Sequence, residues 1–343
     1  MARYDGVFDT LGLREWCDVD KKDGPMSMAQ LLAQTSGNKE ATGDVLPFPS
    51  LDELHESCSA IGQTRDLTAG IEAGFLSIRS TLKAVLDPIT DPLSWMLDGM
   101  LWVFESTAWW IMVPLLIIIS WTVSRSVGVT VFVAIVMLFF GFIDHYEVAM
   151  QTLSIIFVCT GLSVIVGVPI GIGMSKSNAA QRGIIPILDL LQTLPTFVYL
   201  IPLIFLFSVT ESKLYGIAII LYAIVPVIRL TDLGIRLVDK DVIEAANSFG
   251  MNAWQKLTRV ELPLALPNIM AGVNQTIMMS LAMVVIASLV SAPGLGVLVL
   301  RGIRNLELGV GIVAGIGIVL LAVILDRVSK AALSRVDKQN LTK

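Results

Sequence analysis

The side chains of this chain that could do chemistry or bind a partner gather in one polar segment, residues 236–263, between two apolar stretches. Glu244 is followed there by two small residues, Ala245 and Ala246, and Gly250 suits the left-handed turn that ends a helix. Aspartates just before Glu244 can cap that helix. The pattern predicts a short helix, a turn and a second helix. A helix with a small-residue face fits a groove of another protein, although an ordinary interfacial loop is the alternative.

Other reactive side chains in the sequence form no recognisable constellation. His55 and His145 lack the spacing of metal ligands, and no nucleophile motif or phosphate-binding loop occurs. Cys159 lies in an apolar run, whereas Cys17 and Cys58 could pair if their part of the chain lies outside the cell. The sequence therefore predicts a chain that is not an enzyme and that binds no metal or cofactor itself.

The composition places the chain in a membrane. It has 343 residues, 55% of them hydrophobic, and a mean hydropathy of +0.76, which a soluble domain of this size does not reach. The net charge of −5 hides an asymmetry, because residues 1–100 hold 8 Lys and Arg against 16 Asp and Glu, and the remainder holds 16 against 13. An acidic head on a mildly basic body gives no sign of nucleic-acid binding.

The first third of the chain precedes the apolar segments. Residues 1–68 are polar and are predicted to form a loosely ordered tail. Residues 69–106 repeat apolar residues at helical spacing, which predicts amphipathic helices, the first of which ends at Asp87 and Pro88. Their tryptophans favour a position in the plane of the membrane interface, and packing against an extramembrane domain is the alternative.

Apolar segments of the length needed to cross a bilayer, roughly 20 residues, come next in the chain. Two of them occupy residues 107–149, and the fourth is predicted to be interrupted at Pro186 and Pro195. The predicted spans are about 107–123, 127–143, 151–174, 184–208, 214–235, 267–290 and 307–326. We therefore expect an all-α integral membrane protein with about seven transmembrane helices.

The distribution of Lys and Arg predicts the orientation. With residues 236–263 inside the cell, the inner loops and the tail 331–343 hold most of the basic residues, which puts the N-terminus outside and the C-terminus in the cytoplasm. An ion-coupled carrier usually keeps a carboxylate near the middle of the membrane, and the predicted spans show none there. Arg229 and Asp232 lie near the end of a span, where they are placed to pair with each other. The sequence thus indicates an external source of energy.

The polar segment resembles the cytoplasmic EAA loop of ABC-importer permeases, in which a coupling helix docks on the ATPase. The positions that carry the resemblance are Glu244, Ala245, Ala246, Gly250, Val260, Leu262 and Pro263. The surrounding sequence closely resembles that of the permease subunit of ProU-type glycine betaine/proline importers. Examples are LLQTLPTFVYLIPLIFLF at 190–207 and LPLALPNIMAGVNQTIMMSLAMVVIASLV at 262–290.

This resemblance implies a fold, partners and a substrate class. The fold is that of a type I (MetI-like) importer permease, with its core at 150–330 and an extracytoplasmic N-terminal extension. The partners are a second copy of the chain, two cytoplasmic ATPases that use ATP and Mg²⁺, and a periplasmic substrate-binding protein, all at the inner membrane of a bacterium. The substrate is a quaternary amine or a related solute, such as glycine betaine, proline betaine, choline, carnitine or trimethylamine N-oxide.

Polar and aromatic residues within the apolar spans are candidates for the translocation path. They are Gln192, Thr193, Thr196, Phe197, Tyr199, Asn274, Gln275 and Thr276. Aromatic faces attract a quaternary ammonium group, which favours Phe197 and Tyr199 as contacts. Polar groups in membrane helices also serve to hydrogen-bond a neighbouring helix, and that interpretation stays open for each of them.

Three other functions compete with the quaternary amine importer. The chain could be a permease for another small solute such as an amino acid, a carrier that acts alone and is driven by ions, or a membrane enzyme. The family resemblance of the sequence around Thr193 and Asn274 opposes a permease for another solute such as an amino acid. The missing midplane carboxylate and the EAA-like loop oppose the second, and the absence of a catalytic constellation in the sequence opposes the third.

Overall fold

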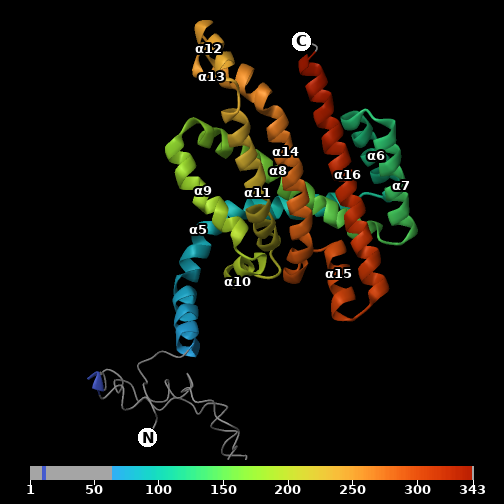
Figure 1. Ribbon diagram of the computed structural model, residues 1–343. Helices are drawn as coiled ribbons and strands as arrows, with labels where there is room; N and C mark the ends of the chain where they lie inside the picture. Colours follow the sequence, from blue (N-terminus) through green and yellow to red (C-terminus); the bar gives the residue numbers. More distant parts are fainter. Residues whose placement is uncertain (1–9, 13–63, 342–343) are drawn as a thin grey trace, which may run out of the picture. The chain divides into compact units, whose positions relative to one another are not determined.

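The computed structural model describes residues 10–12 and 64–341, and over these residues the chain is helical with no strand (Figure 1). The predictions for residues 1–63, including a pairing of Cys17 with Cys58, thus lie almost entirely outside the described residues. Contacts divide the chain into two units, Met1–Thr81 and Leu82–Lys343, and the second unit contains the apolar segments. In chain order the helices are α5 Thr64–Ser106, α6 Trp109–Ser124, α7 Val127–Phe142, α8 Tyr146–Lys176, α9 Asn178–Thr193, α10 Thr196–Leu206, α11 Ser212–Arg236, α12 Lys240–Ser248, α13 Ala253–Lys256, η1 Leu257–Glu261, α14 Leu262–Ala287, η2 Ser288–Val290, α15 Leu295–Arg304 and α16 Leu308–Leu341.

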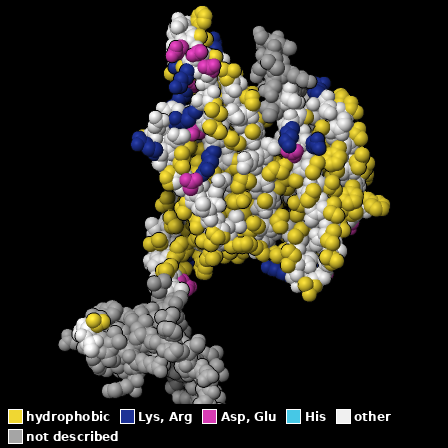
Figure 2. Space-filling view, viewed as in Figure 1, with side chains coloured by type: hydrophobic (Ala, Val, Ile, Leu, Met, Phe, Trp, Pro, Cys, Tyr) yellow, Lys and Arg dark blue, Asp and Glu magenta, His cyan; other side chains and the backbone are white. Residues whose placement is uncertain are grey.

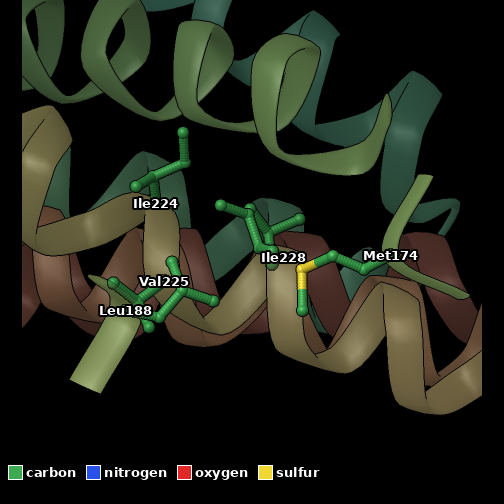
Figure 3. Close-up of a cluster of buried hydrophobic side chains, with 6 residues drawn as sticks. Met174, Leu188, Ile224, Val225 and Ile228 are labelled. Carbon is green, nitrogen blue, oxygen red and sulfur yellow. The ribbon is translucent and has the colours of Figure 1, made fainter. Parts of the chain in front are cut away.

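Helices α8, α11 and α14 pack closely because glycines face their neighbours. A Cβ atom built on Gly171 of α8 would lie 2.6 Å from Cβ of Thr231 in α11. A Cβ atom built on Gly272 of α14 would lie 3.0 Å from Cα of Val227, which is also in α11. Small residues let helix backbones approach in this way where lipid supplies no hydrophobic driving force. Figure 3 shows the apolar cluster beside them, in which Ile228 of α11 lies next to Met174 of α8.

The candidate membrane spans are fewer than the predicted segments. Within the described residues, α8, α11, residues 253–290 and the first 25 residues of α16 are long and apolar enough to cross a membrane. Two further candidates are bent pairs, Thr68–Ser106 with α6 at 113° and α9 with α10 at 96°. Helices α6 and α7 have 16 residues each, about 24 Å at the usual rise, against a hydrocarbon thickness of roughly 30 Å. The described part of the chain therefore holds four to six candidate spans. The segment predicted at 107–123 forms one half of a bent pair, and the segment predicted at 127–143 is a shorter apolar helix.

Prolines interrupt fewer helices than predicted. The prediction that Asp87 and Pro88 end a helix is wrong, because α5 continues through both Pro88 and Pro92. Pro186 likewise lies inside α9, whereas Pro195 does separate α9 from α10. A proline removes one helical hydrogen bond but leaves the rest of the ladder, so packing and ion pairs on either side decide whether the helix continues.

Contacts with the start of α11 hold α5 through its proline-containing stretch. Lys213 has only 5% of its side chain exposed, and its Nζ lies 2.6 Å from Asp87 Oδ1, 2.7 Å from Asp91 Oδ1 and 3.1 Å from Glu211 Oε2. Lys83 reaches the other oxygen of Glu211 at 3.0 Å. Asp87 and Asp91 are four residues apart and thus share one face of α5. Lys213 lies just before the predicted span 214–235, and residue spacing contains no sign of this cluster.

Low pH is expected to weaken this cluster. Burial by itself would raise the pKa of Glu211, but hydrogen bonds from Lys83 and Lys213 and their positive charges outweigh it and lower that pKa below its ordinary value. A carboxyl whose pKa is lower in the folded chain stabilises it above the unfolded pKa of about 4.3, and this contribution is lost as the pH falls through the folded value. In mild detergent, the wild type should unfold at a higher temperature than Glu211→Gln. The difference between the two unfolding temperatures should be constant at pH 6–8, roughly two units above that pKa, and should shrink below about pH 4. A margin that persists unchanged into acid would contradict the ionic role of Glu211.

Candidate functional site

The helix, turn and second helix predicted for residues 236–263 are present as α12, a turn, and α13 followed by η1. The Asp239 side chain caps α12 by accepting a hydrogen bond from the Asp241 N–H at 2.9 Å. Gly250 has φ +73°, and its N–H donates to the Asn247 carbonyl at 2.9 Å. A residue with a side chain is strained at this φ, which explains the glycine. The turn thus has the geometry that its residues indicate.

Hydrogen bonds make α12 and α13 one compact unit. Asn252 and Gln255 form a reciprocal capping box at the start of α13. The Lys256 ammonium donates to the Asn247 side chain at 3.0 Å and so joins α13 to the end of α12. One turn of π-helix, η1, then leads directly into α14. The pair of α12 and α13 is therefore braced internally and continuous with α14.

The outer surface of this unit presents both charge and aromatic side chains. Glu244 and Ala245 are exposed, while Ala246 is buried and seats α12 on the rest of the chain. Phe249 and Trp254 are 83% and 71% exposed. Figure 2 shows acidic and basic side chains gathered over the α12 and α13 end of the helical core, whose sides are largely hydrophobic. Exposed aromatic residues rimmed by charge mark a surface for a protein partner. Sequence reasoning did not assign Phe249 and Trp254 to that surface.

An ion pair and a buried apolar cluster support the base of the unit. Glu261, whose side chain is 6% exposed, pairs with Lys176 at the end of α8. Leu262 packs against a cluster of buried side chains from α11, η1 and α14, which comprises Ile235, Leu257, Ala265 and Ile269. Pro263 lies at the junction where the π-helical turn η1 passes into α14, and its missing N–H removes one hydrogen bond from the helix at that point. Leu262 and Pro263 therefore set the path of the chain, and Glu244 and Ala245 face outward.

The charged residues Arg229 and Asp232 of α11 pair differently from the prediction. Arg229 pairs with Asp189 of α9, and Asp232 accepts hydrogen bonds from Arg236 at 2.8 Å and from Gln181 at 2.7 Å. The predicted pairing of Arg229 with Asp232 is therefore wrong. Helix α9 packs beside α11 and supplies partners from another part of the chain, which spacing along α11 alone cannot indicate.

The candidate path residues fall into two groups. Gln192, Thr193, Phe197 and Gln275 are exposed, and Thr196 is half-buried. Four of these five lie on either side of the 96° bend between α9 and α10, so the bend places them close together. A helix broken inside a membrane leaves backbone groups that only water, protein or a solute can satisfy.

The other three candidates are packed within the chain. The Tyr199 hydroxyl lies 3.6 Å from Sδ of Met283 in α14. Asn274 donates to Asp326 of α16 at 3.0 Å and accepts from Ser329 at 2.8 Å. Thr276 is fully buried. The contacts of Tyr199 and Asn274 correspond to the alternative interpretation of such residues, in which they join neighbouring helices, whereas the Thr276 hydroxyl has no hydrogen-bond partner among the described residues.

Asp326 is a charged residue within a candidate span that sequence reasoning missed. Its carboxylate accepts a hydrogen bond from the Asn274 side chain and pairs with Lys330 at 2.8 Å. The signal was present as an acidic residue at the end of an 18-residue uncharged run, 308–325. Among the described residues, no group of three or more His, Cys, Asp and Glu is placed to hold a metal ion.

Comparisons with known proteins agree on one family. A family model described as "Binding-protein-dependent transport system inner membrane component" matches residues 163–338. The "Glycine betaine/proline betaine transport system permease protein ProW" of Escherichia coli (strain K12) is 39% identical over 289 residues, which are 83% of this chain and 78% of the relative. The "Glycine betaine/carnitine transport permease protein GbuB" of Listeria monocytogenes is 40% identical over 71% of this chain and 87% of its own.

A further relative and a solved structure extend these matches. The "Trimethylamine N-oxide transport system permease protein TmoV" of Pelagibacter ubique is 34% identical over 78% of this chain and 37% of its own length. A chain of the MetNI methionine ABC transporter in an inward-facing conformation superposes with a TM-score of 0.51, over 56% of this chain and 95% of that one, at 19% identity. At that identity the superposition indicates a shared fold and nothing further.

Proposed function

Since the chain belongs to the family of binding-protein-dependent transport system inner membrane components, we propose that it forms the membrane path by which an ATP-driven importer takes up a small quaternary amine. The chain is a multi-pass permease subunit of the inner membrane and leaves ATP hydrolysis to a partner. One structural feature supports the coupling to that partner best: the braced unit of α12 and α13, with Glu244, Phe249 and Trp254 exposed on it.

The remaining parts of the importer follow from this assignment. Two copies of the chain enclose the path, and two ATPases, which use ATP and Mg²⁺, receive α12 of each copy in a groove. A substrate-binding protein delivers the solute on the opposite side, where the N-terminus lies, and the C-terminus is cytoplasmic. When ATP closes the ATPases, α12 moves with them and η1 carries the motion into α14, so that the helices tilt between inward- and outward-facing states.

The substrate class rests on the relatives, whose names give glycine betaine, proline betaine, carnitine and trimethylamine N-oxide. These solutes share a fully substituted, positively charged nitrogen. Such a group cannot donate hydrogen bonds and is held best by aromatic faces and carbonyl oxygens. Phe197 is 53% exposed beside the bend between α9 and α10, and Gln192, Thr193, Thr196 and Gln275 supply polar groups along the proposed path. Tyr199 and Asn274 hold the helices that line it.

Reconstitution tests this function. The chain would be placed in liposomes with its partner ATPase and substrate-binding protein, and uptake of radiolabelled glycine betaine would be measured. We expect uptake that requires both partners and ATP, and competition by unlabelled trimethylamine N-oxide. Uptake by the chain alone without ATP would refute the proposal in favour of a stand-alone carrier, and competition by amino acids only would refute the substrate class.

Phe197→Ala is expected to lower the maximal rate of glycine betaine uptake in this assay about fivefold. The loss of one cation–π contact costs about 1 kcal/mol, which corresponds to that factor. The matched control is Phe205→Ala on the same helix, which is also exposed at 44% but lies away from the bend, and its rate should stay close to wild type. Equal rates for both variants would exclude Phe197 from the path.

A further inference from the structure

A cleft separate from the coupling unit and the proposed path lies between α7 and α16. Its volume is about 280 Å³, and Gly128, Val129 and Phe132 of α7 line one wall, while Val323 and Arg327 of α16 line the other. This volume is close to the lower end of the range for ligand sites, roughly 300 Å³. The walls are apolar except for one guanidinium group. The cleft therefore has room for a segment of hydrocarbon beside a single positive charge.

Arg327 is the group that gives the cleft its charge. Its side chain is exposed, and within the described residues no carboxylate pairs with it. The adjacent Asp326 is engaged elsewhere, since it pairs with Lys330 and accepts a hydrogen bond from Asn274 of α14. An arginine without a carboxylate partner, next to an apolar groove, favours an anion that carries an apolar chain.

The cleft lies where both helices change from apolar to charged residues. Helix α7 begins two residues after Arg125, and α16 is uncharged over residues 308–325 before Asp326 and Arg327. Charged side chains that come after a long apolar run lie at the level of the lipid headgroups, with the apolar run in the hydrocarbon. Arg327 is thus at the depth of a phosphate group, and the walls of the cleft continue toward the depth of the acyl chains.

We propose that this cleft binds one anionic phospholipid, with its phosphate on Arg327 and the first part of an acyl chain between Gly128, Phe132 and Val323. Basic pockets between membrane helices bind acidic lipids in this manner. The walls make the lipid, and not free phosphate, the occupant, because phosphate alone would leave the apolar surface uncovered. The binding does not depend on transport, so it can be tested apart from the proposed function.

Gly128 allows the cleft to be filled without disturbing the helix. A Cβ atom built on Gly128 meets no atom within 4 Å, so Gly128→Leu places a side chain in the cleft and is compatible with the fold. Gly141, near the other end of α7, is equally open, and Gly141→Leu is the matched control. Arg327→Gln removes the charge of the cleft independently. Arg182→Gln, at an exposed arginine of α9, controls for the loss of a positive charge elsewhere in the chain.

The measurement is native mass spectrometry of the full chain in mild detergent, with phosphatidylglycerol or phosphatidylcholine added. We expect one phosphatidylglycerol retained per chain. Phosphatidylcholine should be retained at about one fifth of that level, because the positive charge of its choline group offsets the attraction between its phosphate and Arg327. Gly128→Leu and Arg327→Gln should each lower phosphatidylglycerol retention about fivefold, and both controls should leave it unchanged.

Three results would overturn the proposal. Retention unaffected by Gly128→Leu would exclude this cleft as the lipid site, and equal retention of both lipids would exclude recognition of a net negative headgroup. Displacement of phosphatidylglycerol by inorganic phosphate would show that the site takes a free anion. If one of the two variants fails to fold, the other still tests the proposal, because one acts on the walls and one on the charge.

Discussion

Glu244→Lys is expected to reduce ATP-driven solute uptake to background while the chain still folds and inserts. The Glu244 side chain is exposed on α12, and the Ser248 hydroxyl donates to the backbone carbonyl of this residue and not to its carboxylate. Exposed substitutions away from structural contacts change stability by about 0.5 kcal/mol or less. Charge reversal within a docked surface instead places like charges together or removes an attraction, which costs several kcal/mol.

The measurement pairs uptake with ATP hydrolysis in proteoliposomes that contain the chain, the ATPase and the binding protein. In Glu244→Lys we expect the ATPase either to dissociate or to hydrolyse ATP without moving solute. Glu72→Lys is the matched control, since it reverses an exposed carboxylate of α5 outside the coupling unit, and it should transport as wild type does. Normal uptake by Glu244→Lys would show that α12 is not the docking helix.

Lys176→Met is expected to destabilise the chain by about 3 kcal/mol, because it leaves a buried carboxylate without its counter-charge. Lys176 is 43% exposed, but its partner Glu261 is 6% exposed. Breaking a buried pair from one side costs about 3–5 kcal/mol, and the lower end applies here because Lys176 is partly in water. Since this pair joins the end of α8 to η1, the loss should also loosen the base of the coupling unit.

Thermal unfolding in mild detergent, followed by circular dichroism, measures this loss. The control is Arg301→Gln, which breaks an ion pair whose side chains are 57% and 36% exposed, and it should cost about 1 kcal/mol or less. The double variant Lys176→Met with Glu261→Leu should recover most of the stability, because no buried charge then lacks a partner. A double variant as unstable as Lys176→Met alone would mean that packing and not the ion pair holds η1.

The arrangement of α12 and Gly250 was readable from the residues because it depends on local chemistry. A capping aspartate, a small-residue face and a glycine at positive φ act within one or two turns, and the structure has each of them where the spacing indicated. The all-α fold of a type I importer permease was predictable for a related reason: backbone groups in lipid must be satisfied within each segment, so long apolar runs form helices. The spacing of the EAA-like residues then identified the family.

What the sequence left undecided was which helix faces which. Helical periodicity assigns residues to a face but does not identify the neighbour of that face, and lipid and protein interior are about equally apolar, so burial leaves little trace in the residue types. Only the packed structure pairs Arg229 with Asp189, engages Asn274 with Asp326, and surrounds Lys213 with carboxylates of α5. For the same reason the continuity of α5 through Pro88 was decided by contacts with α11, more than 100 residues away in the sequence.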